Sequence, residues 1–395
     1  MTALDATLPK GPVLGWACFR RVEAPKLASV EDLSHRMLLT SGRAAIYQAL
    51  LQLRLPPGSG VLVPTYHCPT IVAPVILAKH DVHYFGIQPD GLPALGTIDA
   101  TTAKQCRAMI VAHYFGLPKS LAQVRQWCDS NGIALIEDCA HCYFGDAGGK
   151  PIGAWGDYAT ASISKFFPVS EGGLLASARH PISAPHLEKP GWRAQLKAWI
   201  DILEVASRHK RLVGVNALLR TVFWLKNVGA APKGAAGSPA AISAADFMGD
   251  CDMARIAQEP VAATKFLNRH LPHGRVIDNR RKNFEHYARK LSQLTGARAL
   301  FPAMQAASAP YVFPLWVDDS ERVYQALRKL KMPVFRWDRI WPATPVLTGD
   351  AGPLWSQHVL QLLCHQDLDE TDIENVANTI LKLLALPNAA PTQTR

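Results

Sequence analysis

Two residues in the middle of the chain have the types and the spacing that chemistry on a carbonyl group requires. The apolar run Ile133–Ile136 is followed closely by Asp138, and Lys165 comes after a small, serine-rich segment. A short apolar run that leads to an aspartate is typical of a buried strand that delivers a carboxylate to the edge of a parallel sheet, where open α/β sheets bind ligands. The lysine would then lie in a tight turn near that carboxylate, where its amine can act as a nucleophile.

An aspartate and a lysine placed in this way suit pyridoxal phosphate (PLP). The lysine forms a Schiff base with the cofactor, and the carboxylate keeps the pyridine nitrogen protonated so that the ring accepts electrons. Because an amine must be neutral to attack an aldehyde, we expect a desolvated or cationic pocket that lowers the pKa of Lys165. A solvated surface lysine and a helix cap at Asp138 are the alternatives. The serine-rich approach to Lys165 and the Glu171-Gly172-Gly173 sequence beyond it favour the chemical interpretation.

A second group of residues has the features of a phosphate site. Ser41, Gly42 and Arg43 precede residues 44–53, which have helix-forming residues and apolar side chains at helical spacing. Ser41 occupies the expected N-cap position, and Gly42 permits close approach of the backbone. Free N–H groups and the positive end of the helix dipole can hold a phosphate there. A plain helix cap is the alternative.

Strands and helices alternate over the part of the chain that must position these residues. Apolar runs predict strands at residues 61–63, 82–87, 108–112 and 133–136, and helical spacing predicts helices at residues 44–53, 70–78 and 120–131. This alternation predicts an α/β domain with a largely parallel sheet. The strand ends would place Tyr66 and His67, His113 and Tyr114, and Asp138 at one sheet edge, which predicts a binding site there. His113 could instead be a core histidine.

The second part of the chain predicts a smaller α+β domain. Helices are expected at residues 253–267, from residue 279 onward, and at residues 320–330 and 371–386, and strands at residues 311–317, 334–335 and 359–364. We therefore divide the chain into a large α/β domain over residues 1–250 and a small C-terminal domain over residues 251–395. The strand-end positions of Arg336, Trp337 and His365 make these residues candidates for the lining of a substrate pocket.

A basic insertion at about residues 185–245 interrupts the large domain. Residues 192–226 are helical in character and basic, and they include Trp192, Trp199 and Trp224. We expect a helical excursion that packs on the enzyme body or forms part of a subunit interface. An amphipathic basic helix with tryptophans can also lie on a membrane surface, so peripheral membrane contact through residues 192–226 is the alternative. Residues 229–239 predict a linker or loop.

Composition limits the class of protein. The 395 residues are 48% hydrophobic and 19% charged, which is typical of a globular protein with a large core. The net charge of +10 comes from dispersed basic residues, so we expect no nucleic-acid partner. Eight scattered cysteines, and a segment Met1–Lys10 without an apolar core, predict reduced thiols and a cytoplasmic location. The sequence Cys139-Ala140-His141-Cys142 suggests zinc, but no second ligand pair has suitable spacing, so we expect no metal.

Three separated segments together resemble the DegT/DnrJ/StrS-type aminotransferases, which are PLP enzymes of the aspartate-aminotransferase fold (fold type I). The segments are residues 41–45 (Ser-Gly-Arg-Ala-Ala), residues 136–141 (Ile-Glu-Asp-Cys-Ala-His), and residues 162–165 (Ser-Ile-Ser-Lys) with the Glu-Gly-Gly of residues 171–173. Their order and rough spacing also agree with the family, and the resemblance covers roughly residues 35–385. In this fold two subunits normally complete each other's sites, so the resemblance implies a homodimer.

The resemblance also implies a role for each matched residue. Lys165 would hold the cofactor and shuttle protons, and Asp138 would pair with the pyridinium nitrogen. Ser162 and the backbone of residues 41–43 would bind the phosphate, and His141 would lie near the 3-hydroxyl group of the cofactor. Many members of the family place an aromatic ring over the cofactor in the loop after the first of the predicted strands. Here the register puts Cys68 at that position, so the choice among Tyr66, His67 and another residue stays open.

The function implied by the resemblance is transfer of an amino group, from glutamate, to a nucleotide-linked keto-sugar. Such sugars serve the synthesis of polysaccharide, lipopolysaccharide or secondary metabolites. A PLP-dependent sugar dehydratase is one alternative, but the dehydratases of this family can replace the lysine by histidine, and Lys165 is present. A non-catalytic or regulatory protein that retains the fold is the other alternative, and the intact pair of Asp138 and Lys165 argues against it.

Overall fold

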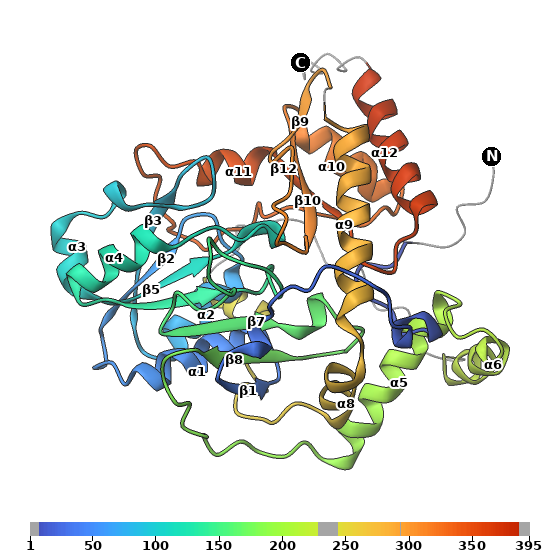
Figure 1. The fold of residues 1–395 in the computed structure, drawn as a ribbon, viewed down its shortest axis with the longest axis horizontal. Helices are drawn as coiled ribbons and strands as arrows, with labels where there is room; N and C mark the ends of the chain where they lie inside the picture. The colour runs from blue at the N-terminus through green and yellow to red at the C-terminus, as the bar shows by residue number, and fades with distance from the viewer. Residues whose placement is uncertain (1–7, 228–243, 293, 387–395) are drawn as a thin grey trace.

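The large sheet of the protein has eight strands and forms one layer of the molecule (Figure 1). The structure is a computed structural model that describes residues 8–227, 244–292 and 294–386. Along the sheet the strands are β1 (His35–Leu39), β8 (Gly173–Ser177), β7 (Tyr158–Ser162), β6 (Ala134–Asp138), β5 (Cys106–Ala112), β2 (Gly60–Pro64), β3 (Asp81–Ile87) and β4 (Pro93–Ala94). The central run from β7 to β3 is parallel, whereas β8, β1 and β4 pair antiparallel. The predicted mostly parallel sheet is confirmed.

Helices cover both faces of this sheet. They are α1 (Gly42–Leu53), α2 (Pro69–Leu77), α3 (Ala100–Gln105) and α4 (Ala122–Asn131). Val61 and Val63 of β2 join a core cluster with residues of α1 and α2, whereas Leu62 joins a second cluster that includes Val124 of α4. Because side chains alternate along a strand, a strand apolar on both sides must be buried on both faces. This explains why the central strands have continuous apolar sequences.

The C-terminal part of the chain builds a second, antiparallel sheet. Its strands are β9 (Ala297–Ala299), β10 (Val312–Val317), β11 (Val334–Phe335) and β12 (Val359–Leu363), in the order β11-β12-β10-β9. Its helices are α9 (His273–Lys290), α10 (Ser320–Lys329), α11 (Gly352–His358) and α12 (Glu370–Ala385). These elements confirm the predicted mixture of helices and antiparallel strands. The predicted division of the chain at residue 250 stays a prediction.

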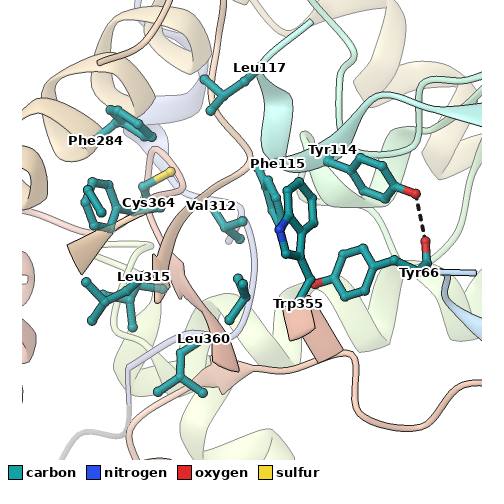
Figure 2. Packing of buried hydrophobic residues seen from close by; sticks show 14 of the residues in the cluster. Tyr66, Tyr114, Phe115, Leu117, Phe284, Val312, Leu315, Trp355, Leu360 and Cys364 are labelled. Carbon is teal, nitrogen blue, oxygen red and sulfur yellow. Dashed lines mark hydrogen bonds between the residues drawn. The ribbon is translucent and has the colours of Figure 1, made fainter. Parts of the chain in front are cut away.

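The two sheets share one apolar cluster (Figure 2). Tyr66 and Tyr114 follow strands of the large sheet, and the hydroxyl of Tyr114 donates a hydrogen bond of 2.7 Å to the backbone oxygen of Tyr66. Both rings contact the indole of Trp355 in α11, at centroid distances of 5.4 and 5.6 Å. The end of the large sheet is therefore fixed against the second sheet by buried aromatic contacts.

Two predicted helix starts were wrong. The helix predicted over residues 253–267 begins at Ala262 and forms α8 (Ala262–His270). Pro260 disfavours helical backbone at the preceding residue, so the chain can enter the helix only after it. The helix predicted from residue 279 begins at His273, and the signal was obscured by Gly274. A Cβ atom at Gly274 would lie 2.3 Å from the backbone oxygen of Val22, so glycine there allows the N-terminal segment to cross α9.

The basic insertion forms a helical hairpin at the edge of the molecule (Figure 1). Its helices are α5 (Trp192–Arg208) and α6 (Asn216–Asn227), and α7 (Ala244–Asp250) follows. The helical character predicted for residues 192–226 is confirmed, with a break at residues 209–215. The linker predicted at residues 229–239 lies outside the described residues. No described helix combines the length and the apolar character that crossing a membrane requires. Short 3-10 turns occur at Trp16–Phe19, Val30–Asp32, Leu95–Thr97, Tyr114–Gly116 and Ile163–Lys165.

Candidate active site

One cavity of about 490 Å³ opens at the carboxyl ends of β5, β6 and β7. All seven residues predicted for the site line it: Ser41, Gly42, Arg43, Asp138, His141, Ser162 and Lys165. They come from three chain segments that parallel strands and the β1–α1 turn bring to one sheet edge. The structure therefore brings together every residue selected for this site, although their chemical roles stay predictions.

Lys165 ends the 3-10 turn that follows β7, and its position is fixed from behind by Arg280. Arg280 of α9 is fully buried, and its Nη2 donates a 2.6 Å hydrogen bond to the backbone oxygen of Lys165. Its Nη1 and Nε donate to the Pro310 backbone oxygen and to Oε1 of Gln366, at 3.1 and 2.9 Å. Burial lowers the pKa of Arg280 to about 10. The guanidinium thus fastens the lysine turn to the second sheet.

The amine of Lys165 and the carboxylate of Asp138 each affect the pKa of the other. Burial lowers the pKa of Lys165, and the nearby Cys68 thiol and Asp138 carboxylate oppose this effect. Burial raises the pKa of Asp138, and the Lys165 amine opposes it most strongly. Asp138 ends β6, and its Oδ1 accepts a 3.0 Å hydrogen bond from the backbone N–H of Ala140. A lowered pKa favours the neutral, nucleophilic form of the amine, which attack on an aldehyde needs.

His141 carries a polar atom that no described residue satisfies. Its Nδ1 is buried and has no hydrogen-bond partner. The imidazole lies between the rings of Tyr311 and Trp337, at centroid distances of 4.4 and 4.8 Å. Burial and the Lys165 amine lower the pKa of His141 well below its usual range, so the ring is neutral. A buried unpaired nitrogen in a cavity predicts a ligand group that exchanges a hydrogen bond with it.

The start of α1 and the end of β7 together make an anion cradle. The Oγ of Ser41 accepts a 3.2 Å hydrogen bond from the N–H of Ala44, which confirms the predicted N-cap. A Cβ atom at Gly42 would lie 3.5 Å from the Cβ of Ser162, so the two segments are adjacent. At Gly173 a Cβ atom would lie 2.0 Å from the backbone oxygen of Ser41, so only glycine lets β8 pass this turn. The cradle offers backbone N–H groups and hydroxyls, which are the donors that a phosphate needs.

The mouth of the cavity contains charged residues that the sequence did not single out. Asp252 and Arg255 line it together with Arg43. The Nε of Arg43 donates a 3.1 Å hydrogen bond to the backbone oxygen of Asp252. Arg255 pairs through both terminal guanidinium nitrogens with the carboxylate of Glu171. No local motif marks residues 252–255, because they reach the cavity only through the fold.

The loop after β2 presents Cys68 to the cavity, and its neighbours Tyr66 and His67 point elsewhere. Tyr66 is fully buried in the aromatic cluster. The Nδ1 of His67 lies 2.9 Å from the backbone oxygen of Pro64, and its Nε2 accepts a 3.1 Å hydrogen bond from the N–H of Trp341. Neither Tyr66 nor His67 lines the cavity, which argues against both as the ring over the cofactor.

Among the C-terminal candidates for the pocket lining, Trp337 lines the cavity, and Arg336 and His365 do not. Arg336 forms ion pairs of 2.7 Å with both Glu321 and Asp338. His365 is buried, and its Nε2 lies 3.0 Å from the backbone oxygen of Pro9. The indole of Trp337 is thus the aromatic surface that this part of the chain contributes to the cavity.

Among the described residues, a buried cluster of possible metal ligands adjoins the cavity, which His113 lines. Donor atoms of His113, Glu137 and Cys139 lie within 4.8 Å of one another. The Glu137 carboxylate already accepts hydrogen bonds from His113 at 2.9 Å and from the backbone N–H groups of Gly153 and Gly156 at 3.2 and 2.5 Å. Burial raises the pKa of the Cys139 thiol well above its usual range, which disfavours the thiolate that binds metals. Internal hydrogen bonding therefore accounts for this cluster.

Comparison with known proteins points to the same family as the residues that line the cavity. Residues 23–185 match the family described as the DegT/DnrJ/EryC1/StrS aminotransferase family. The family resemblance is confirmed. The chain is 26% identical to the GDP-perosamine synthase of Vibrio cholerae over 203 residues, which are 49% of this chain and 55% of that protein. It is 29% identical over 173 residues to the UDP-N-acetyl-3-dehydro-alpha-D-glucosamine 3-aminotransferase of Acidithiobacillus ferrooxidans, covering 40% of this chain and 44% of that enzyme.

These alignments span about half the length of each of the two relatives. A solved structure extends the likeness to nearly the whole chain. The aminotransferase TlmJ of Streptoalloteichus hindustanus superposes with a TM-score of 0.59 at 19% identity, over 89% of this chain and 86% of that one. At that identity the likeness concerns the fold, and it confirms the predicted fold class.

The cavity residues fit a bound PLP. The anion cradle suits its phosphate, and the unpaired Nδ1 of His141 suits a hydrogen-bonding ring substituent. Burial raises the pKa of Asp138, and a pyridinium nitrogen beside it would supply the compensating positive charge. Three separate features of the cavity therefore match three parts of one cofactor.

Proposed function

We propose that this protein is a PLP-dependent aminotransferase that moves an amino group from glutamate to a nucleotide-linked keto-sugar. The observation that carries the proposal is the position of the half-buried Lys165 and the buried Asp138 in the same cavity, with the pKa of the amine lowered. When bound, PLP accepts the electron pair of the bond that breaks at the substrate carbon. A lysine of this kind does not serve a stable core, because burying an amine is unfavourable unless it has a chemical use.

Each residue of the cavity has a distinct task in this proposal. Lys165 would hold the cofactor through its Nζ, and its amine would carry a proton to and from the substrate carbon. Asp138 keeps a positive charge on the ring nitrogen, and His141 orients the ring through its Nδ1. Ser162 and the start of α1 anchor the phosphate. The cavity walls exclude water, which strengthens each of these electrostatic interactions.

The substrate part of the proposal rests on the relatives and on the cavity mouth. Both relatives named above are enzymes of nucleotide-linked sugars by their names. Arg43 and Arg255 line the mouth, and guanidinium groups suit the phosphates that such sugars carry. The product would serve the synthesis of polysaccharide, lipopolysaccharide or secondary metabolites.

The proposal includes a homodimer in the cytoplasm and a chain divided near residue 250. The dimer is supported by the fold class, in which two subunits normally complete each other's sites. All eight cysteines are free thiols, which supports a reducing compartment. The two sheets, one mostly parallel and one antiparallel, support the division into a large and a small domain.

A sugar dehydratase is the rival reaction at the same cavity, and Lys165 argues against it. A non-catalytic protein with this fold is the rival outside enzymes. It would leave the pKa-shifted pair of Lys165 and Asp138 without a use.

A two-stage assay tests the proposal. Protein loaded with PLP is mixed with glutamate, and 2-oxoglutarate is measured in a single turnover. The protein is then supplied with GDP-, UDP- and dTDP-linked 3-keto and 4-keto sugars, and the products are identified by mass spectrometry. We expect stoichiometric 2-oxoglutarate and an amino sugar from one nucleotide class, with Lys165→Ala inactive and the exposed Lys104→Ala fully active.

Two results would overturn this function. A deoxygenated sugar without a new amine would identify a dehydratase. If no 2-oxoglutarate forms and none of the sugars is converted, the result would favour the non-catalytic alternative.

A further inference from the structure

The hairpin of α5 and α6 exposes a set of aliphatic side chains. Val213, Val215, Leu218 and Val222 are exposed by 76%, 38%, 67% and 50%, and they all lie within ten residues of the chain. We call these four residues the outer face. Single exposed aliphatic residues are ordinary, but a concentrated set on a projecting element indicates a binding surface.

The outer face contributes a backbone contact to the attachment of the hairpin, a 2.9 Å hydrogen bond from Nε1 of Trp16 to the backbone oxygen of Val213, while its side chains stay exposed. Further attachment comes from α5, which buries Ala198, Ile202 and Ala206 and brings Trp199 to 6.1 Å from Phe266 of α8. Figure 1 shows α6 at the edge of the molecule, with α5 on its inner side. The aliphatic side chains of the outer face therefore stay exposed on an element at the edge of the molecule.

Basic residues flank the outer face. Arg208, Lys210 and Arg220 are exposed, and we call them the basic flank. The sequence contains no aspartate or glutamate between Glu204 and Asp246, so the segment that carries the outer face is purely basic. This combination of aliphatic and basic residues is complementary to a surface that is apolar inside and anionic outside.

A groove between α5 and α6 adds a site for an anionic group. Ser207, Arg208, Arg220 and Thr221 line it together with Glu204, whose carboxylate forms a 3.3 Å ion pair with Arg208. The hydroxyl of Ser207 is buried and has no hydrogen-bond partner, and the whole residue is only 2% exposed. The Arg220 guanidinium and the unsatisfied Ser207 hydroxyl are donors of the kind that a phosphate ester binds, whereas Arg208 is shared with Glu204.

We propose that the α5–α6 hairpin docks the protein on an anionic phospholipid bilayer. The outer face enters the boundary between headgroups and acyl chains, and the basic flank and the groove bind headgroup phosphates. A second copy of this chain is a poorer occupant, because a symmetric contact would place the two basic flanks against each other. Docking does not depend on the reaction at the cavity.

Co-sedimentation of the full-length, PLP-loaded protein with lipid vesicles tests this proposal. The vesicles consist of phosphatidylcholine alone or of phosphatidylcholine mixed with phosphatidylglycerol. We expect binding to the mixed vesicles at low salt, and weaker binding at high salt, because exposed charges are screened. The double variant Leu218→Glu/Val222→Glu should bind at least about tenfold more weakly. Lys210→Gln/Arg220→Gln should lose affinity by about tenfold as well.

The control is Val346→Glu, which places one glutamate at a side chain that is 84% exposed elsewhere. It should bind vesicles like the unchanged protein, and circular dichroism should show that all variants are folded. The proposal fails if the unchanged protein ignores phosphatidylglycerol vesicles at low salt, or if Leu218→Glu/Val222→Glu binds them equally well. It also fails if light scattering shows that this variant loses a dimer while lipid has no effect, since the outer face would then bind a second copy.

Discussion

Ionisable groups are shielded from water in the cavity at the sheet edge, and they are exposed to water on the α5–α6 hairpin. In the cavity, Asp138 and His141 are buried and Lys165 is half-buried, and removal from water is the largest cause of the pKa shift of each. In the hairpin, the basic flank remains exposed to water while aliphatic residues are also exposed. In the cavity, the fold places a few ionisable groups where their charged forms are unfavourable. In the hairpin, the fold only attaches the exposed residues to the rest of the molecule.

The contrast shows which of the two regions depends on accurately placed side chains. A buried amine and carboxylate are useful only if the surrounding elements hold them in place, and Arg280 shows how far that support extends. The outer face needs no such support, because a lipid surface is fluid and has no fixed partner atoms. Changes in the cavity should therefore alter chemistry or folding, whereas changes in the outer face should alter neither.

The largest effect is expected from Asp138→Asn. A neutral amide cannot stabilise positive charge on the cofactor ring, so the rate of the glutamate half-reaction should fall by about a hundredfold or more. Stopped-flow absorbance after mixing with glutamate measures this rate. The exposed Asp81→Asn is the matched control and should keep the full rate. An unchanged rate in Asp138→Asn would remove the carboxylate from the chemistry.

A large loss of stability is expected from Arg280→Ala. The change deletes a buried side chain and leaves the Lys165 and Pro310 oxygens and the Gln366 amide oxygen without their donor. The free energy of unfolding should fall by about 3 kcal/mol, as measured by urea denaturation. Arg289→Ala, at an exposed position of the same helix, should change it by at most about 0.5 kcal/mol. Equal stability of the two variants would contradict the support assigned to Arg280.

An acid dependence of stability is expected from His67, which lies beside the cavity loop. Burial lowers the pKa of His67 to about 4, whereas a histidine in an unfolded chain has a pKa near 6.5. The unfolded chain therefore binds more protons than the folded one between these pH values. The free energy of unfolding should fall as pH decreases from about 6.5 toward 4, by up to about 3 kcal/mol from this residue.

Urea denaturation at several pH values checks the dependence on His67. The decline should be shallower in His67→Gln and unchanged in His270→Gln, where the side chain is exposed. A decline equally steep in His67→Gln would assign the acid sensitivity to other groups, such as the buried His365.

The smallest effect is expected from Leu218→Gln/Val222→Gln. These side chains are largely exposed, so their replacement should change the free energy of unfolding by at most about 0.5 kcal/mol. The contrasting variant is Ile202→Ala on the buried side of α5, which should lose about 3 kcal/mol. A large loss in the double variant would show that the outer face is part of the folded core.

Much of the cavity could be predicted from sequence, because its main residues follow apolar strands directly. Asp138 ends the continuous apolar run of β6, and Lys165 lies just beyond β7. Ser41 was recognisable as an N-cap, because capping depends on neighbouring residues alone. Signals that are local along the chain were therefore sufficient for these positions.

The contacts that support these residues could not be predicted in the same way. Arg255 meets Glu171 across 84 residues of sequence, and Arg280 meets Lys165 across 115. The antiparallel return of β8 beside β7 also lacked a signal, because residues 158–162 are mostly small and have no apolar alternation. Cys68 lines the cavity, and Tyr66 and His67 do not, because these two residues contact Trp355 and Trp341 instead.

The most direct test of the central claim is the visible absorption spectrum of the purified protein with PLP. We predict a visible band from the lysine-bound cofactor in the unchanged protein and in Lys104→Ala, and no such band in Lys165→Ala. A band that persists in Lys165→Ala, or the absence of any band in the unchanged protein, would contradict the assignment of this cavity to PLP.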